Sequence, residues 1–438
     1  MSWHRFKTVK GIVDWRLCLG CGACAYICPE GKITLVDVVS EGIRPLVANE
    51  QCGSCTDCLT VCPAHVNDHR PLLRQPGLIP EIKPAYGPAL ELWEGYAADP
   101  EIRRLGSSGG LLTALSLYCL EREGMHGVVH IAGNPRDPIR NCTRLSRTRA
   151  ELLAATGSRY APASACDSLG MIETAPTPCV FIGQPSEVTA LRKAEALRPA
   201  LRRNVGLTLS FFCAGSPATR GTEELLRAEG IPLHEVAELR YRGRGWPGWF
   251  AVRRKGETEF TPLKTYEESW GFLQRFRPFA VHLTPDSSGE DADISCGDPW
   301  YRPVRKDEAG FSLVVTRTER GRELLRRARE AGYVHLEPME VSKALQSQVN
   351  LIRKRGAIWG RVLMFRLFGL PVTRLRGYSL FRNWLKLPLV EKGKSTLGTA
   401  RRILQRGYRR PLVIAAEDVV RRENATVSAR TQTVNVHG

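Results

Sequence analysis

Eight cysteines near the N-terminus are the residues whose type and spacing most clearly predict chemistry in this 438-residue chain. They form two runs of the pattern Cys-x2-Cys-x2-Cys-x3-Cys-Pro, at residues 18–29 and 52–63. Thiolates at this spacing are typical ligands of a four-iron, four-sulfur (4Fe-4S) cluster, which serves electron transfer. The predicted ligands are Cys18, Cys21, Cys24, Cys28, Cys52, Cys55, Cys58 and Cys62.

The pattern also predicts which cysteines share a cluster. In proteins with two such runs, the first three cysteines of a run bind one cluster and the fourth binds the other. Zinc prefers two separated pairs of ligands, and disulfides form in oxidising compartments, so both alternatives are weaker. One predicted set is Cys18, Cys21, Cys24 and Cys62, and the other is Cys52, Cys55, Cys58 and Cys28.

The composition is that of an ordinary globular protein, with 43% hydrophobic and 25% charged residues. The length allows roughly two to four domains. Residues 1–10 lack the apolar core of a signal peptide, and no uncharged apolar run reaches the roughly 18 residues that a membrane span needs. The other six cysteines are scattered without paired spacing. We therefore expect a cytoplasmic protein with reduced thiols.

The net charge of +18 lies almost entirely in the last hundred residues. Residues 341–438 contain 20 Lys or Arg and 4 Asp or Glu, whereas residues 1–340 contain 43 and 41. The folded body is therefore not expected to bind nucleic acid. The basic segment is expected to form amphipathic helices. These suit peripheral contact with an anionic membrane or an acidic partner, or else their apolar faces pack on the body. From about residue 424 we expect disorder.

Alternating strands and helices after residue 93 predict a mostly parallel α/β layer. Around the cysteine runs, residues 6–13 and 32–38 are predicted as short strands, and the proline-rich residues 71–88 as a linker. Further predicted strands are 128–132, 179–183, 207–213, 249–252 and 311–316, and predicted helices are 111–124, 185–197, 217–229 and 319–331. The predicted domains are 1–70 (cluster module), 71–92 (linker), 93–175 and 176–337 (two parts of the body) and 338–438 (basic helical tail).

Small residues at strand ends are candidates for ligand binding. The turn Ser107–Gly110 leads into a helix, so its free N–H groups suit a phosphate, with a plain helix cap as the alternative. The loop Gly157–Tyr160 offers close backbone approach, a cation and an aromatic face. Gly183–Gln184 and Cys213–Gly215 end strands where α/β sheets bind ligands. Cys213 itself is predicted as a small buried apolar residue.

Two glycine-rich segments resemble nucleotide-binding motifs but lack their context. Gly243–Gly248 spells Gly-x-Gly-x-x-Gly, but a proline interrupts it and a strand follows. Gly393–Thr396 resembles the end of a phosphate-binding loop, but Pro388 stands where that loop needs glycine. Asp293 and Asp298 lie in a turn-rich segment and are predicted as turn-formers bonded to backbone, with catalytic carboxylates as the alternative. No catalytic acid or base is predicted.

Six stretches between residues 100 and 317 are modest alone but specific as an ordered set. They are Ser107–Gly110, Gly157–Tyr160, Gly183–Pro185, the strand ending at Cys213, Tyr241–Trp246 and Ala292–Asp298. In this order they resemble the coenzyme F420 hydrogenase/dehydrogenase beta-subunit family, whose members pair iron-sulfur clusters with FAD. The flavin-binding residues that the resemblance implies are Ser107, Ser108, Gly109, Gly110, Gly157, Ser158, Arg159, Tyr160, Gly183, Gln184, Arg242, Gly243, Gly245 and Trp246.

The chain departs from that family at three places. Ser186 stands where many relatives have a cysteine, and Val281–Thr284 where they have Cys-x-x-Cys. Those cysteines bind an additional cluster in relatives, so their absence implies that the body holds no cluster of its own. Arg159 stands where the family has lysine, which keeps the charge but not the shape.

The resemblance implies a two-cluster ferredoxin module, a mixed α/β flavin-binding body and a basic helical tail. We expect an FAD-dependent iron-sulfur oxidoreductase that passes electrons between its clusters and FAD, and on to coenzyme F420 or another small organic substrate. The expected redox partner is a ferredoxin or a hydrogenase/dehydrogenase subunit. The alternative is a non-catalytic subunit that hands electrons to a partner protein.

Overall fold

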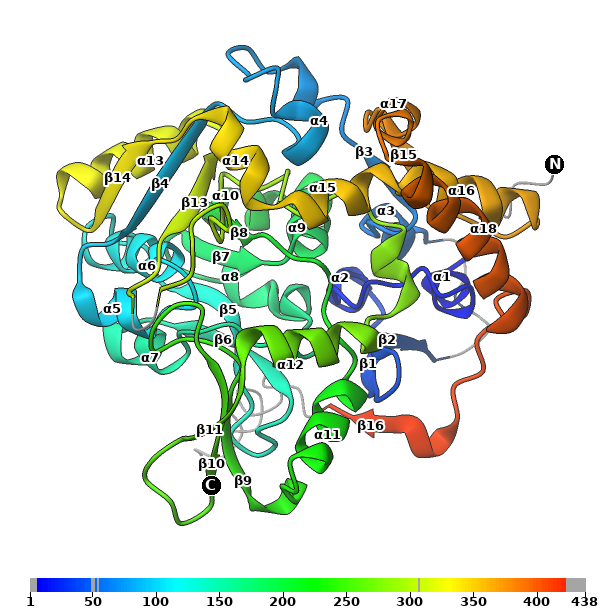
Figure 1. The fold of residues 1–438 in the computed structure, drawn as a ribbon, viewed down its shortest axis with the longest axis horizontal. Coiled ribbons are helices and arrows are strands. Elements are labelled where there is room, and N and C mark those ends of the chain that lie inside the picture. The colour runs from blue at the N-terminus through cyan, green and yellow to red at the C-terminus, as the bar shows by residue number, and fades with distance from the viewer. Residues whose placement is uncertain (1–5, 49–51, 53–54, 306–307, 423–438) are drawn as a thin grey trace, which may run out of the picture.

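A mixed eight-stranded sheet forms the centre of the computed structural model, which describes residues 6–48, 52, 55–305 and 308–422 (Figure 1). The strand order is β14-β4-β13-β12-β8-β7-β5-β6. The run from β12 to β5 is parallel, and the remaining neighbours are antiparallel. The strands are β4 (Glu91–Ala97), β5 (Val128–Gly133), β6 (Asn141–Ser146), β7 (Cys179–Gly183), β8 (Val205–Phe211), β12 (Ile294–Gly297), β13 (Ser312–Thr316) and β14 (Val334–Pro338).

Helices cover both faces of this sheet, so its middle strands are buried on both sides. Val180 and Leu209 point into one core, which α6 and α13 complete, whereas Phe181 points into the core under α9. Every strand and helix predicted in the body is present, with ends within one turn of those expected. The helices are α5 (Pro100–Leu105), α6 (Leu111–Glu121), α7 (Arg149–Ala154), α8 (Gly170–Glu173), α9 (Pro185–Leu197), α10 (Pro199–Asn204) and α13 (Glu319–Glu330).

The prediction of a mostly parallel sheet is wrong outside the four middle strands. β13 returns beside β12 through a segment without a helix among its described residues, and an antiparallel pair needs no crossover helix. A second, three-stranded antiparallel sheet packs with two helices around Leu239 and Phe250. Its elements are α11 (Thr219–Ala228), β9 (Val236–Arg240), β10 (Trp249–Arg254), β11 (Thr261–Thr265) and α12 (Tyr266–Leu273).

The cysteine module contains one helix where a strand was expected. The strand predicted at residues 6–13 is wrong, because α1 (Val9–Asp14) begins after Thr8, whose hydroxyl accepts a hydrogen bond from the Lys10 amide. Buried residues at 9, 12 and 13 follow the helical repeat. The strand at 32–38 is confirmed. The other elements are α2 (Ala23–Ile27), β1 (Ile33–Val38), β2 (Gly42–Val47), α3 (Asp57–Thr60) and β3 (Val66–Asp68).

The basic tail returns to the cysteine module and pairs with it. β15 runs parallel to β3, and β16 runs antiparallel to β1, at the edge of the module (Figure 1). The predicted helices are present, and the alternative in which apolar faces pack inward holds for α16, whose Phe365 is buried. The elements are α14 (Val341–Ser347), α15 (Val349–Gly356), α16 (Ile358–Leu367), β15 (Arg374–Arg376), α17 (Leu380–Leu385), α18 (Leu389–Gln405) and β16 (Val419–Arg421).

Contact of the tail with a membrane or an acidic partner stays a prediction. α18 buries Thr399 and Ile403 but leaves Leu389 and Leu397 exposed. Across the described residues, no helix combines the length and apolar character that crossing a membrane requires. The disorder expected from residue 424 lies outside the described residues.

The domain boundaries also stay predictions, but the segment predicted as a linker is packed. Ile82 and Tyr86 are fully buried, beside and within α4 (Lys83–Tyr86), and the Tyr86 hydroxyl donates a hydrogen bond to the carbonyl of Ala344. This contact joins the segment to the tail helices rather than leaving it on the surface.

Candidate functional site

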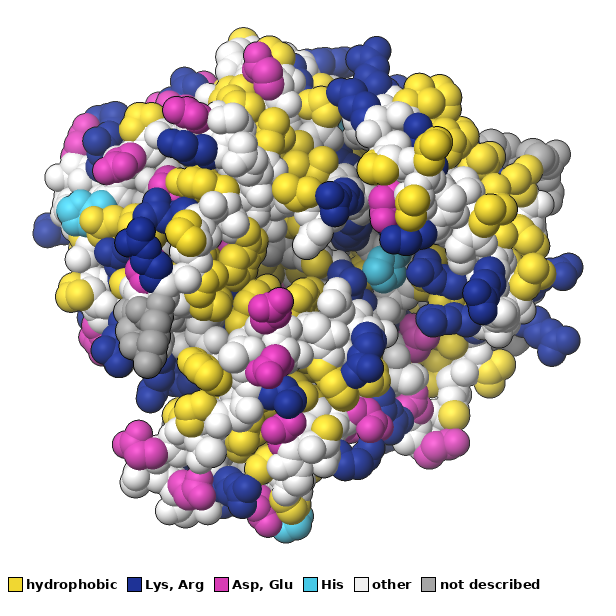
Figure 2. Space-filling model, viewed as in Figure 1, with side chains coloured by type: hydrophobic (Ala, Val, Ile, Leu, Met, Phe, Trp, Pro, Cys, Tyr) yellow, Lys and Arg dark blue, Asp and Glu magenta, His cyan; other side chains and the backbone are white. Residues whose placement is uncertain are grey.

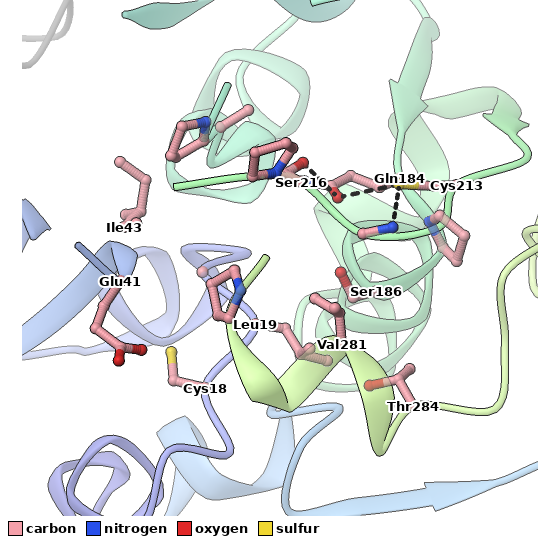
Figure 3. Close-up of a pocket in the computed structure, with 18 of the residues that line it drawn as sticks. Cys18, Leu19, Glu41, Ile43, Gln184, Ser186, Cys213, Ser216, Val281 and Thr284 are labelled. Atoms are coloured by element: carbon pink, nitrogen blue, oxygen red, sulfur yellow. Dashed lines mark hydrogen bonds between the residues drawn. The ribbon is translucent and has the colours of Figure 1, made fainter. Parts of the chain in front are cut away.

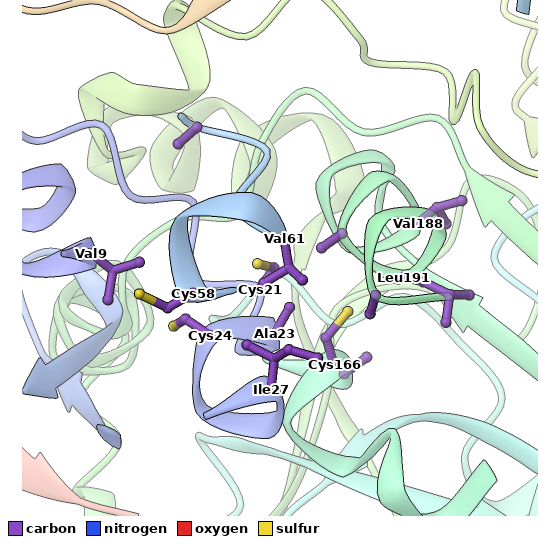
Figure 4. Close-up of a cluster of buried hydrophobic side chains, with 14 of the residues drawn as sticks. Val9, Cys21, Ala23, Cys24, Ile27, Cys58, Val61, Cys166, Val188 and Leu191 are labelled. Atoms are coloured by element: carbon purple, nitrogen blue, oxygen red, sulfur yellow. The ribbon is translucent and has the colours of Figure 1, made fainter. Parts of the chain in front are cut away.

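Each cysteine run turns into a short helix, α2 or α3, which brings its thiols close together. Gly20 and Gly22 have left-handed φ angles of 78° and 86°, so glycine lets the first loop curl without strain. All eight thiols are free of disulfides. Figure 4 shows Cys21, Cys24 and Cys58 buried in one cluster of side chains. Eight free, clustered thiols are a donor set that fits two 4Fe-4S clusters.

The last cysteine of the second run lies with the first run. The pKa of the Cys62 thiol is raised to about 12, first by burial and then by negative charge at Cys18. Burial also raises the pKa of Cys21, and the next contribution comes from Cys62. We call Cys18, Cys21, Cys24 and Cys62 the proximal group.

The remaining cysteines form a second set, the distal group. Burial raises the pKa of Cys58, and charge on Cys52 and Cys55 raises it further. The pKa of Lys32 is raised first by Glu30 and more weakly by Cys52 and Cys28. The charge of Cys58, in the distal group, also acts on Cys24 in the proximal group, so the crossed ligand assignment stays a prediction.

Alanine at the two crossing positions tests this assignment. Cys62→Ala should remove the same 4Fe-4S cluster as Cys18→Ala, and Cys28→Ala should remove the same cluster as Cys55→Ala. In each case the cluster loses one of its four thiolate ligands. Electron paramagnetic resonance of the reduced proteins would show two matching pairs of spectra. If Cys62→Ala instead matched Cys55→Ala, each run would hold its own cluster.

The proximal group lies against the body. The Cys166 amide donates a hydrogen bond to the carbonyl of Cys21 at 3.1 Å, and Lys193 Nζ donates to the carbonyl of Cys62 at 3.0 Å. A Cβ on Gly22 would lie 2.9 Å from the amide nitrogen of Asp167, so only glycine fits this contact. The module therefore presents one cluster site to the body and keeps the other on its far side.

A pocket lies between Cys18 of the proximal group and the loops at the edge of the sheet (Figure 3). Its module wall is Cys18–Gly20 and Glu41–Arg44, and its body wall is the loops after β7 and β8. Gln184 Oε1 accepts a hydrogen bond from the Ser216 hydroxyl at 3.3 Å and lies 3.8 Å from Cys213 Sγ. The enclosed cavity is only about 50 Å³, so a larger molecule bound here would extend through the side that is open to solvent.

The positions where relatives carry cluster cysteines line this same pocket. Ser186, Val281 and Thr284 surround it together with Cys213 (Figure 3). Cys213 was predicted as a small buried apolar residue, but it also lines the pocket. A single body thiol among hydroxyl and aliphatic groups is a poor donor set for a cluster.

One buried cluster of acidic groups and histidine resembles a metal site but is an ion-pair network. Among the described residues, His69, Asp286 and Asp291 offer closely spaced donor atoms. Burial would lower the pKa of His69, but Glu290 and Asp291 outweigh it and raise the pKa to about 10. A protonated imidazole has no lone pair for a metal. Glu290 also pairs with Arg355 of the tail, so module, body and tail meet here.

The Ser107–Gly110 turn lies at the carboxyl end of β4. The Ala97 amide donates to the carbonyl of Gly109, and a Cβ on Gly109 would lie 2.6 Å from the carbonyl oxygen of Gly95. Gly110 is the N-cap of α6 and supplies no side-chain cap. Ser107 Oγ accepts a hydrogen bond from the Ser158 amide at 2.5 Å. The close backbone and the uncapped first turn fit a phosphate group.

Two other predicted flavin segments lie beside this turn. A Cβ on Gly243 would lie 2.5 Å from the carbonyl oxygen of Leu105, and Gly157 lies against the carbonyl of Arg242. Arg159 is fully used by protein acceptors, donating to Asn141 Oδ1 and to the carbonyls of residues 138, 140 and 239. Its contact with flavin stays a prediction, and its visible role is to hold loops together.

Asp298 differs from its prediction as a turn-former. Its carboxylate accepts two hydrogen bonds from Arg242, at 2.8 and 2.9 Å, and one from Trp246 Nε1 at 2.8 Å. Tyr266 and Trp300 stack beside this pair with ring planes 7° apart. Asp293 does bond to backbone, accepting from the Thr208 amide. As expected, the glycine-rich segment is followed by β10, not by a helix.

All predicted flavin segments thus lie at one edge of the sheet. β4 runs the same way as β12, β8 and β7, because it is antiparallel to β13, which is antiparallel to β12. Ligands bind at the carboxyl ends of such strands. Three segments (107–110, 157–160, 242–246) gather near β4, and Gly183–Gln184 lies four strands away, about 19 Å at the usual strand spacing.

Lys354 of α15 is a pocket residue that sequence reasoning missed. Its Nζ donates a hydrogen bond to the Ser287 hydroxyl at 2.8 Å. Burial lowers its pKa to about 7, and the neighbouring Arg277 and Arg361 contribute to the lowering. In sequence it is one of many basic residues of the tail, so no local signal marks it.

Comparison with known proteins agrees with these observations. The model of the "Coenzyme F420 hydrogenase/dehydrogenase, beta subunit" N-terminal region matches residues 92–169, and that of its C terminus matches residues 178–342. A "4Fe-4S dicluster domain" model matches residues 17–66. Together the two beta-subunit models cover more than half of the chain.

Individual relatives are distant. A coenzyme F420-dependent sulfite reductase of Methanocaldococcus jannaschii is 23% identical over 78% of this chain, which spans only 50% of that relative's length. The beta subunit of coenzyme F420 hydrogenase from Methanococcus voltae is 24% identical over 63% of this chain and 95% of its own. A chain of the F420-reducing NiFe hydrogenase complex of Methanosarcina barkeri is 20% identical, with a TM-score of 0.49, over 66% of this chain and 97% of its own.

Proposed function

The chain belongs to the coenzyme F420 hydrogenase/dehydrogenase beta-subunit family, and from that premise we propose that it is an iron-sulfur flavoprotein oxidoreductase. It passes electrons between its two 4Fe-4S clusters and FAD, and on to coenzyme F420 or another small organic substrate. Two relatives carry names that refer to coenzyme F420, which supports this acceptor for the proposal.

The pocket between Cys18 and the loops after β7 and β8 is the observation that carries the proposal. One of its walls is a predicted cluster ligand, and another is the sheet edge where α/β proteins bind cofactors. An electron entering at the distal group would reach the proximal group next and then a molecule in this pocket. This route needs no additional cluster in the body, where Ser186, Val281 and Thr284 stand in place of the cysteines of relatives.

The supporting observations for FAD are the small-residue turns on the same sheet edge. The Ser107–Gly110 turn suits the pyrophosphate, and Gly183–Gln184 would contact the ring that exchanges electrons in the pocket. Bound flavin would join the one-electron chemistry of the clusters to two-electron chemistry of an organic substrate. The protein's part is to hold these groups close together and away from water.

Anaerobic purification tests this proposal. We expect about eight irons and about one FAD per chain, with flavin absorbance that bleaches when reduced coenzyme F420 is added. Replacing Gly109 with alanine should lower the FAD content, because the added Cβ collides with the Gly95 carbonyl. A colourless protein without iron or flavin would contradict the proposal.

The second candidate, a non-catalytic electron-transfer subunit, is favoured by the surface of α18. Leu389, Val390 and Leu397 are exposed there among basic residues, as a partner protein would require. A panel of small acceptors separates the two functions, since such a subunit would reoxidise only with a protein partner.

A further inference from the structure

Four cations of the body and tail gather beside the pocket, around His282. They are Lys354 of α15, Arg361 of α16, Arg402 of α18, and Arg277, which precedes the pocket residue Pro278; of the four, Lys354 lines the pocket itself. The pKa of His282 is lowered to about 2, first by burial and then by these four charges. Figure 2 shows Lys and Arg side chains collected next to the hollow in the middle of this face, where α15, α16 and α18 run.

Within the part of the chain that the structure describes, none of these cations lies within ion-pair distance of a carboxylate. Arg361 donates to the carbonyl of His282 at 2.7 Å, and Arg277 donates to the carbonyl of Ala214 at 3.0 Å. Arg361 Nε is buried and has no hydrogen-bond partner. Glu391, the acidic residue whose charge favours Arg361, is paired with Lys394.

Two buried cations elsewhere in the protein are paired with carboxylates, whereas the buried Arg317 bonds only to a hydroxyl and to carbonyls. Arg242 pairs with Asp298, and Arg355 pairs with Glu290. Of the four cations around His282, three are partly buried and Arg402 is exposed. Like charges that gather in a partly desolvated place repel one another, and an anion in the pocket would offset this repulsion. Among the described residues, Asp286 is the one acidic side chain of the body that lines the pocket, and it accepts hydrogen bonds from the amides of residues 288, 289 and 290.

The iron-sulfur clusters, themselves anionic, have a different cation nearby. Lys193 Nζ contacts the carbonyl of Cys62, and the charge of Cys62 acts on Lys193. The groups whose charge favours protonated Lys354 are Cys213 and Asp286, neither of which is a predicted cluster ligand. The cations around His282 are therefore placed for a molecule in the pocket.

We propose that the pocket binds a small organic anion, with its phosphate or carboxylate group held by Lys354, next to Arg361 and Arg277, and its reacting end against the flavin ring that Gly183–Gln184 would contact. The proposal rests on the proposed function for the role of this anion as the substrate that exchanges electrons. Three of the four cations come from the tail, beyond residue 342, where the family models end. The tail thus supplies substrate recognition as well as a contact with the module.

Binding of inorganic pyrophosphate to the full, FAD-loaded chain tests the site directly. Calorimetry at low ionic strength should show binding by the parent protein, and binding weaker by about tenfold or more in Lys354→Met and in Arg361→Gln. Lys394→Met is the matched control, since Lys394 is exposed on α18 and outside the cluster. It should bind pyrophosphate within about twofold of the parent. If Lys354→Met and Arg361→Gln both bound pyrophosphate as tightly as the parent protein, the proposal would be overturned.

Two further readouts separate the outcomes. Iron and FAD content should be unchanged in both variants, and the KM for coenzyme F420 should rise about tenfold with little change in kcat, as expected for lost binding energy. If the variants lost FAD, the substrate assignment would be overturned, because the cations would then bind the pyrophosphate group of FAD. If the variants lose pyrophosphate binding but the parent protein contains no FAD and reacts with no small acceptor, the anion site stands and the proposed function is refuted. If Lys354→Met does not fold, Arg361→Gln decides.

Discussion

Replacing Cys21 with alanine is expected to lower the iron content from about eight to about four per chain and to stop electron transfer into the pocket. Cys21 is buried in the proximal group, and its carbonyl accepts a hydrogen bond from the body. Since the described residues of the body offer no other predicted cluster site, every electron must pass through this group. Reduction of a molecule in the pocket should therefore fall to background with any donor that enters through the clusters.

Cys55→Ala, in the distal group, should have a different effect. It leaves the proximal cluster and FAD in place, so dithionite, a small reductant, should still reduce the protein while a one-electron protein donor should not. Cys142→Ala is the matched control, because that half-buried thiol lies outside both runs. Stopped-flow absorbance with both donors measures the difference. If Cys21→Ala reduced a molecule in the pocket as fast as the parent protein does, electron transfer through the proximal group would be contradicted.

Glu290→Gln is expected to destabilise the protein by about 3–5 kcal/mol. The side chain of Glu290 is 1% exposed and pairs with both Arg355 and His69. Burial alone would raise its pKa, but the charges of Arg355 and His69 hold the pKa well below its usual range. Glutamine keeps the size of the side chain yet leaves two buried cations without a counter-charge. The loss should loosen the module from the body, because His69 follows β3 and Arg355 lies on α15.

Chemical denaturation under anaerobic conditions measures this effect. Asp68→Asn is the control: it removes a surface pair with Arg70, and the expected cost is no more than about 1 kcal/mol. A free energy of unfolding for Glu290→Gln within 1 kcal/mol of the parent, on the same order as the control, would show that the network contributes little.

The same network predicts how stability depends on pH. The pKa of His69 is raised from an ordinary value of 6.5 to about 10 in the folded protein. Its stabilising contribution is therefore fully present below pH 6.5 and is lost as the pH rises through about 10. Glu290→Gln, whose His69 has lost its main counter-charge, should show a smaller decline over that range than the parent.

The sequence alone was enough to predict the elements whose signals are local. The cysteine runs lie within twelve residues each, and the strands and helices of the body follow hydrophobic repeats, so both could be read without a partner segment. The ordered motifs also indicated the family. The strand predicted at residues 6–13 is wrong, although the sequence contains a local signal for a helix there, the N-cap residue Thr8.

Only the tertiary structure decided which distant residues share a site. Asp298 is an ion-pair partner because the chain brings Arg242 beside it, 56 positions earlier. The pocket combines Cys18, Gln184, Cys213, Val281 and Lys354, which come from separate segments and meet only when sheet, module and tail pack together.

The cluster ligands could be predicted from the short spacing within two cysteine runs, because the sequence itself determines that spacing. The candidate substrate pocket depends on long-range packing, in which a basic tail folds back and places Lys354 in the same pocket as Cys18. No periodicity or composition distinguishes such a lysine from a solvated one, because its burial is a property of the assembled fold.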